Sequence, residues 1–82
     1  MDIEKLRNLI KDSLDSDAKV IIESNDGHHF DAIVISDEFI GKSLLQRQRK
    51  IFKPLSDYIS SGDLHALSLK AYTNKEWNTK SE

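Results

Sequence analysis

The chain has 82 residues, a length that suits one domain with a single modest core. It contains no cysteine, which excludes disulfides and any metal site built from its own thiolates. The net charge is −2, and because the charged N-terminus leads into no long apolar run, we expect no signal peptide, no membrane span and a cytoplasmic location.

The first predicted element is a helix. Apolar residues recur at intervals of three and four between residues 3 and 14, which is typical of a helix with one buried face. Asp2 precedes them and is a candidate N-cap, because its carboxylate can accept a hydrogen bond from the first helical turn.

A β-hairpin is predicted next. Residues 19–24 and 30–36 are short segments rich in β-branched side chains, which predict two strands. Residues 25–27, Asn-Asp-Gly, join them and favour the left-handed conformations of a turn. His28 and His29 therefore lie just past the hairpin tip.

Two consecutive helices should follow, over residues 43–53 and 54–61. Ser43 is a plausible N-cap for the first helix. Pro54 interrupts the helical pattern, and proline is disfavoured inside a helix but fits the first turn of a new one. Gly62 is expected to end the second helix.

A half-buried strand is predicted over residues 64–72, where apolar and polar side chains alternate. Thr73 is a candidate cap for a short turn that holds Trp77, and residues 78–82 are expected to be a mobile tail. The order αββααβ indicates an α+β domain over residues 1–82. Its three-stranded sheet should be mixed, because the double-helix connection is long enough for a parallel crossover, with the helices packed on one face.

The sequence contains no complete catalytic motif. Gly41-Lys42-Ser43 matches only the end of a phosphate-binding loop, because Ser36 stands where that motif needs a glycine. No serine lies in a glycine elbow, and Asp37 and Glu38 fall in a loop where solvation explains paired carboxylates. We therefore expect that the chain is not an enzyme.

Positive charge is concentrated in one predicted helix. Residues 42–53 carry five basic side chains and no acidic one, whereas residues 1–41 carry ten acidic and four basic side chains. Such a surface suits a negatively charged partner, either protein or nucleic acid, although a solvated helix face has the same pattern. The five residues are Lys42, Arg47, Arg49, Lys50 and Lys53.

The three histidines are candidate metal ligands. His28 and His29 lie near the hairpin tip, and His65 opens the third strand. Imidazole can replace thiolate at iron–sulfur centres, but two or three histidines do not fill the four ligand positions of a cluster. A second molecule would have to supply thiolates. The alternative is that all three are ordinary surface or half-buried strand residues.

Several motifs occur in one order between residues 19 and 77. They are Gly27-His28-His29-Phe30, residues 39–44 leading into residues 46–49, residues 64–73, and Glu76-Trp77. This series resembles the BolA-like family, and most closely its short bacterial branch called IbaG or YrbA. The resemblance implies a fold similar to a class II KH domain.

The resemblance further implies an adaptor that binds a monothiol glutaredoxin, in iron–sulfur trafficking or stress response. In such complexes a [2Fe–2S] cluster is shared, and the glutaredoxin side contributes its own cysteine and a glutathione thiolate. The BolA-like side contributes a histidine that matches His65 and one ligand from the hairpin loop. His28 and His29 are both candidates for this loop ligand, and we prefer His28. Asp26 stands where some relatives carry cysteine. The isolated chain is expected to hold no cofactor and to be a monomer or weak homodimer.

The alternative function is that of a nucleic-acid-binding transcription regulator that uses the basic helix 43–53. KH-like folds bind single strands, and some BolA-like relatives are described as transcription regulators. The backbone clamp Gly-x-x-Gly is missing between the paired helices, where residues 52–55 read Phe-Lys-Pro-Leu. The missing clamp argues against this alternative, and DNA is kept as the partner that it would require.

Overall fold

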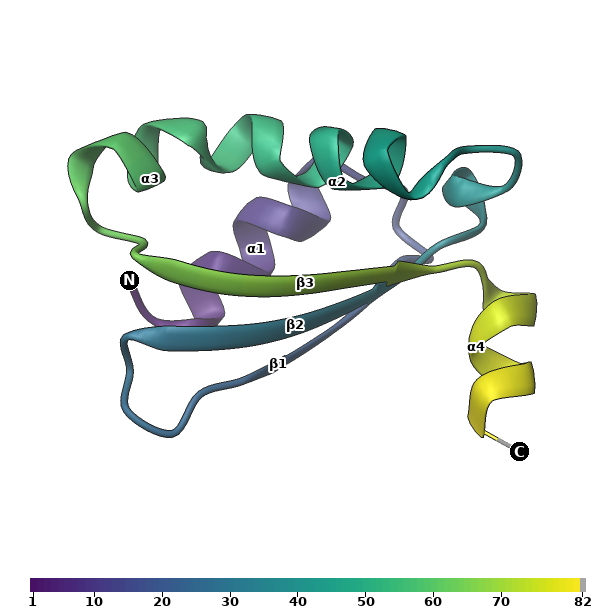
Figure 1. Ribbon diagram of the computed structural model, residues 1–82, viewed down its shortest axis with the longest axis horizontal. Coiled ribbons are helices and arrows are strands. Elements are labelled where there is room, and N and C mark those ends of the chain that lie inside the picture. The colour runs from purple at the N-terminus through teal and green to yellow at the C-terminus, as the bar shows by residue number, and fades with distance from the viewer. Residues whose placement is uncertain (82) are drawn as a thin grey trace.

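The computed structural model describes residues 1–81 and contains a three-stranded sheet with helices around it (Figure 1). The elements in chain order are α1 (Ile3–Asp12), β1 (Lys19–Glu23), β2 (His29–Ile35), the 3-10 turn η1 (Asp37–Phe39), α2 (Leu44–Phe52), the 3-10 turn η2 (Lys53–Leu55), α3 (Ser56–Ser61), β3 (Ala66–Tyr72) and α4 (Asn74–Ser81).

The sheet has the order β1-β2-β3, with β2 in the centre. β1 pairs with β2 in the antiparallel direction of a hairpin, and β3 pairs with β2 in the parallel direction. The register places His29 beside Ala66 at one end and Ile35 beside Tyr72 at the other. The α+β class and the mixed three-stranded sheet predicted from the sequence are confirmed.

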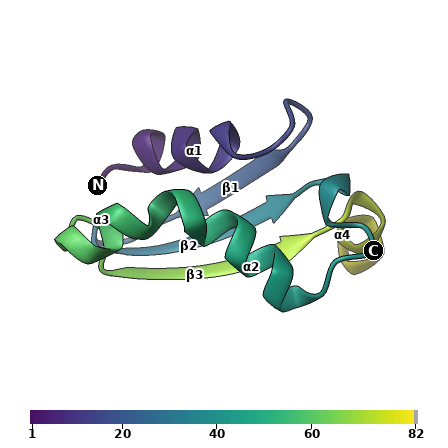
Figure 2. The ribbon, with the colours of Figure 1, turned by 90° about the horizontal axis from the view of Figure 1, so that it is seen from above.

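Helices α1, α2 and α3 cover one face of the sheet, as the view from above shows (Figure 2). α1 lies nearest β1, and the α2–α3 pair lies nearest β3. Buried and more exposed side chains alternate along β1 and most of β2, because every second side chain points toward the face that the helices cover. The most completely buried core side chains are Leu6, Ile10, Val34, Ile35, Phe39, Ile51, Leu55 and Leu64.

The predicted helix ends are confirmed by their caps. Asp2 accepts a hydrogen bond from the Lys5 backbone N–H at 2.8 Å. Ser43 and Gln46 form a reciprocal capping box, in which each side chain accepts from the other's backbone N–H. Gly62 ends α3 with a left-handed φ of 87°, a conformation that favours glycine.

The junction of the two central helices differs from the prediction of helices over 43–53 and 54–61. α2 ends at Phe52, and Pro54 lies in the 3-10 turn η2, before α3 begins at Ser56. Proline removes one backbone donor and crowds the preceding turn, so a short 3-10 segment accommodates it between the two helices.

The C-terminal segment forms more helix than predicted. α4 extends to Ser81, so residues 78–81 of the predicted mobile tail are helical, and residue 82 lies outside the described residues. Thr73 caps this helix as predicted, because its hydroxyl accepts from the Glu76 backbone N–H at 3.2 Å. α4 reaches past the end of the sheet, where Trp77 packs against Tyr72 with ring centroids 5.6 Å apart. Within residues 1–81, no helix has the length and apolar character needed to cross a membrane.

Candidate functional site

The starts of β2 and β3 lie at the same end of the sheet. The two strands are parallel and His29 is the register partner of Ala66, so the residues that precede each strand are neighbours. His29 and His65 consequently line one open pocket of about 440 Å³. The structure thus brings together two candidate ligands that are far apart in the sequence.

His65 is exposed and lies directly before β3. Its ring lies close to Gly62, the residue that follows α3, because a Cβ at that position would be 3.6 Å from His65 Cε1. No hydrogen bond or ion pair engages the His65 ring within the part of the chain that the structure describes. Both ring nitrogens are therefore available to a ligand or metal from outside.

His29 is held by Asp26 of the hairpin turn. His29 Nδ1 lies 2.7 Å from Asp26 Oδ2, while Asp26 Oδ1 accepts the backbone N–H groups of His28 and His29 at 2.8 and 2.9 Å. These two N–H groups, and then the His29 ring, hold the pKa of the Asp26 carboxyl well below its usual range. The turn therefore presents an ionised carboxylate to the imidazole.

The Asp26 carboxylate determines which nitrogen of His29 can bind a metal. An ionised carboxylate only accepts hydrogen bonds, so Nδ1 of His29 must donate and carries the proton. In the neutral ring Nε2 then keeps its lone pair, and pairing with a carboxylate also makes that nitrogen a better ligand. The His29 side chain is 75% exposed, so Nε2 is accessible.

His28 does not line this pocket, although it is exposed and adjacent in the sequence. β2 begins at His29, one residue earlier than predicted, and this start places His29 in the sheet beside β3. The structure therefore places His29, and not His28, beside His65, while the identity of the second ligand stays a prediction. Among the described residues, no group of three or more histidines and carboxylates is arranged to hold a metal.

Four of the five predicted basic surface residues lie together on α2 and just beyond its two ends. An open pocket of about 360 Å³ is lined by Lys42, Gln46, Arg49, Lys50 and Lys53. Lys50 Nζ lies 3.6 Å from Glu38 Oε1, which neutralises part of the charge. The remaining cations give this flank of α2 a positive surface.

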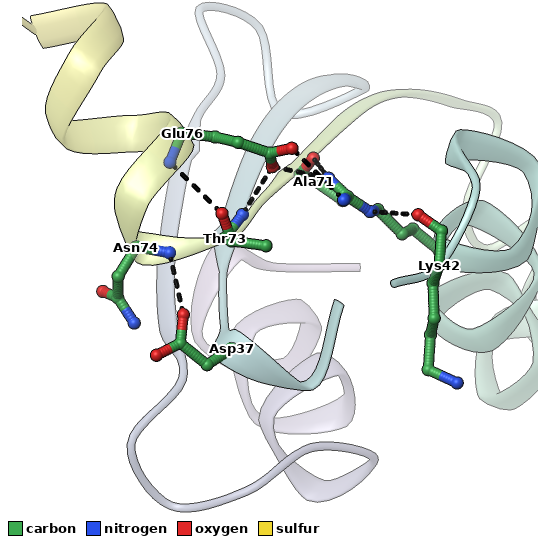
Figure 3. A network of polar contacts seen from close by, with 7 residues as sticks. Asp37, Lys42, Ala71, Thr73, Asn74 and Glu76 are labelled. Atoms are coloured by element: carbon green, nitrogen blue, oxygen red, sulfur yellow. Dashed lines mark hydrogen bonds and ion pairs between the residues drawn. The ribbon is translucent and has the colours of Figure 1, made fainter. Parts of the chain in front are cut away.

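Arg47, the fifth predicted surface residue, is buried, so its predicted exposed position is wrong. It is 6% exposed and donates to the Lys42 carbonyl at 3.1 Å, to the Ala71 carbonyl at 3.2 Å, and to Glu76 at 2.6 and 3.3 Å (Figure 3). The pKa of the Glu76 carboxyl is lowered to about 2, mainly by its hydrogen bond from Arg47 and next by the hydrogen bond from the Thr73 backbone N–H. Arg47 therefore ties α2 to β3 and α4.

Among residues 1–81, no strand pairs with the outer edge of β3, and α2 partly closes that edge. Tyr72 directs its carbonyl toward the central strand, where it accepts from the chain just after β2 at 2.9 Å. Because carbonyl directions alternate along a strand, those of Leu69 and Ala71 point outward. Gln48 donates to the Leu69 carbonyl at 2.9 Å, and Arg47 donates to that of Ala71. Side chains of α2 thus occupy positions that another strand would need.

A family model described as BolA-like protein matches residues 5–76. The chain belongs to the BolA-like family. The acid stress protein IbaG of Escherichia coli (strain K12) is 43% identical over 54 residues, covering 66% of this chain and 64% of IbaG. The DNA-binding transcriptional regulator BolA of the same strain is 43% identical over 49 residues, covering 60% of this chain and 46% of that protein.

The fold is also that of BolA-like proteins. The structure of a bolA protein homologue from Coxiella burnetii matches with a TM-score of 0.78 and 37% identity, covering 95% of this chain and 97% of that chain. In this BolA-like chain the motif segments converge in space. Residues 29–31 and 65–68 line the pocket shared by His29 and His65, called the histidine pocket below. Residues 39–49 run from the end of η1 through the following loop into α2.

Proposed function

We propose that this BolA-like protein is a non-enzymatic adaptor that binds a monothiol glutaredoxin and shares a [2Fe–2S] cluster with it in the cytoplasm. The supporting observation is that His29 and His65 line one open pocket, with Asp26 fixing the proton of His29 on Nδ1. A role in iron–sulfur trafficking under stress agrees with the name of the acid stress relative.

The donor set of this chain fits half of such a cluster. A [2Fe–2S] cluster needs four protein or glutathione ligands, and two histidines can replace two thiolates on one iron. The chain has no cysteine, and its pocket offers two imidazoles. A glutaredoxin cysteine and a glutathione thiolate would supply the other two positions.

Each residue of the pocket has a defined role in this proposal. His65 and Nε2 of His29 bind, and Asp26 keeps the His29 ring in the tautomer that can bind. Gly62 lets the chain turn from α3 toward β3 while leaving the His65 ring at the surface. Two neutral imidazoles in place of two thiolates would raise the reduction potential of the shared cluster, because they add no negative charge.

A mixing experiment tests this proposal. Cluster-loaded monothiol glutaredoxin is titrated anaerobically with this chain, and visible circular dichroism and molecular mass are followed. We expect new visible bands that saturate at one chain per glutaredoxin. A spectrum equal to the sum of the two components would contradict the proposal.

DNA binding is a second candidate, supported by the basic flank of α2 and by the name of the E. coli regulator. Its test is the salt dependence of binding to a duplex oligonucleotide. Contacts from Lys42, Arg49 and Lys53 to phosphates predict a slope of log K against log salt of about −0.9 for each contact. A slope near zero would exclude this candidate.

A further inference from the structure

We propose a second docking site, at the start of α2, for an acidic protein segment that carries apolar side chains. This site goes beyond the proposed cluster sharing, because it uses none of the histidine pocket. Its features are exposed aliphatic side chains, an adjacent row of unpaired cations, and a groove between α2 and the edge of β3.

The aliphatic part of the site is unusually exposed. Ile40, Leu44 and Leu45 are 65%, 72% and 58% exposed, and they are the three most exposed large hydrophobic residues of the described chain. All three lie within six consecutive residues, in the loop before α2 and its first turn. Clustered apolar exposure of this kind is typical of a protein interaction surface.

The cations follow directly along the helix. Arg49 lies one turn after Leu45 on the same exposed side, and Lys53 lies one turn after Arg49. Lys42, Arg49 and Lys53 make no ion pair within the part of the chain that the structure describes. A partner segment that contacts Leu45 therefore reaches unpaired positive charge within about 6 Å, the usual spacing between such helical neighbours.

The groove lies on the other side of the exposed leucines. Two small pockets of about 260 and 220 Å³ share Leu44, Ala71 and Tyr72 among their lining residues. The outward carbonyls of Leu69 and Ala71 are already bonded to α2 side chains. The groove therefore suits apolar side chains from a partner, as in helix-in-groove recognition, and does not suit an added strand.

The residue types favour a protein partner over a nucleic acid. Nucleic-acid surfaces that accept single strands combine cations with aromatic rings on which bases stack. Here the residues beside the cations are the aliphatic Ile40, Leu44 and Leu45. Charge complementarity and apolar anchors together describe an acidic, amphipathic peptide segment.

The second site is remote from the histidine pocket. Tyr72 and Ala66 mark opposite ends of β3, and six strand steps of about 3.3 Å separate them by roughly 20 Å. Figure 1 shows the start of α2 beside the end of β3 where α4 begins, away from the end where β2 and β3 start. One chain could hold a cluster-bearing partner at one end and an acidic protein at the other.

The test uses a peptide of about 16 residues, with leucines at helical spacing on one face and glutamates on the other. The 15N-labelled chain is titrated with this peptide while amide shifts are recorded. We expect saturable binding with a Kd below about 1 mM, shifts in residues 40–49 and 69–72, and no shift at His29 or His65.

Matched variants test which side chains contribute to peptide affinity. The double substitution Leu44→Ser and Leu45→Ser, and separately Arg49→Glu, should each weaken binding about tenfold. Ile59→Ser is the control, because Ile59 is also exposed, at 43%, but lies on α3. It should leave the affinity unchanged.

Three outcomes would overturn the proposal. They are no binding at about 1 mM peptide, equal binding of a scrambled peptide of the same composition, and binding of a duplex oligonucleotide at the same residues with no effect of the leucine substitutions. No glutaredoxin or cluster is present in these titrations. A negative result in these titrations would therefore count against the docking site alone. A negative result in the glutaredoxin experiment would count against cluster sharing alone.

Discussion

The Arg47 guanidinium and the Glu76 carboxylate, 29 residues apart in the chain, meet at 2.6 Å between α2 and the first turn of α4. The same Glu76 carboxylate accepts the Thr73 backbone N–H at 2.8 Å. One ion pair thereby fixes the capped start of α4 to the side of α2. The C-terminal helix is thus attached through a polar network as well as through the contact of Tyr72 with Trp77.

Arg47→Gln should destabilise the fold by about 2 kcal/mol, because the buried Ala71 carbonyl and the Lys42 carbonyl would lose their charged donor. Urea unfolding of the variant measures this loss. Arg49→Gln is the matched control, since Arg49 is exposed on the same helix, and it should change stability by less than about 0.5 kcal/mol. Equal effects of the two substitutions would contradict the assigned role of Arg47.

The Glu76 interaction predicts a loss of stability in acid. The folded pKa of Glu76 is about 2, below its ordinary value of 4.5, so its stabilising contribution is present above pH 4.5 and disappears as the pH falls toward 2. Glu76→Gln should therefore lower the unfolding free energy at pH 6 and flatten its pH dependence between 4.5 and 2. Wild-type and variant curves that stay parallel across this window would refute the prediction.

Gly62→Ala and Gly41→Ala form a matched pair. Both glycines have φ near +80°, at 87° and 78°, so each substitution should cost about 1 kcal/mol in chemical denaturation. Only a Cβ at position 62 meets His65, at 3.6 Å, whereas nothing lies within 4 Å at position 41. NMR signals of the His65 ring should consequently shift in Gly62→Ala alone. A similar shift of the His65 ring signals in both variants would show that direct contact with the added methyl group at position 62 is not its cause.

Asp26→Asn tests the control of the His29 tautomer. An asparagine oxygen can still accept the two backbone N–H groups of the turn, so the hairpin should persist. The amide NH2 group then faces Nδ1 and can only donate, which favours the tautomer that carries its proton on Nε2. Long-range 1H–15N NMR of the wild type should show the proton on Nδ1 of His29, and the variant should show a mixture with the Nε2 tautomer. An unchanged tautomer would rule out this role for Asp26.

Local signals in the sequence predicted the helix ends and turns correctly. Asp2, Ser43 and Gly62 act within one turn of the chain, so no distant contact was needed to recognise them. The length of the last helix was missed. Its start depends on the Thr73 cap, but its attachment depends on Arg47, which lies far away in the sequence.

Two site assignments, Arg47 and the choice between His28 and His29, show what the sequence pattern could not resolve. Arg47 stands one turn before Ile51 and two turns before Leu55, both fully buried, so helical spacing already indicated that it faces the core. Its positive charge nevertheless suggested an exposed position. The choice between His28 and His29 depends on where β2 begins. The strand starts at His29, one residue earlier than predicted, and a difference of one residue changes which side chain faces the pocket.

The proposed function requires that His29 and His65, and not His28, supply the nitrogen ligands of a cluster shared with a glutaredoxin. Pulsed EPR of the reduced heterocomplex measures this directly, through the hyperfine couplings of ligand 14N nuclei. We expect two imidazole couplings in the wild type and in His28→Ala, and one coupling in His29→Ala and in His65→Ala. Loss of a coupling in His28→Ala, or two couplings retained in His29→Ala, would contradict this assignment.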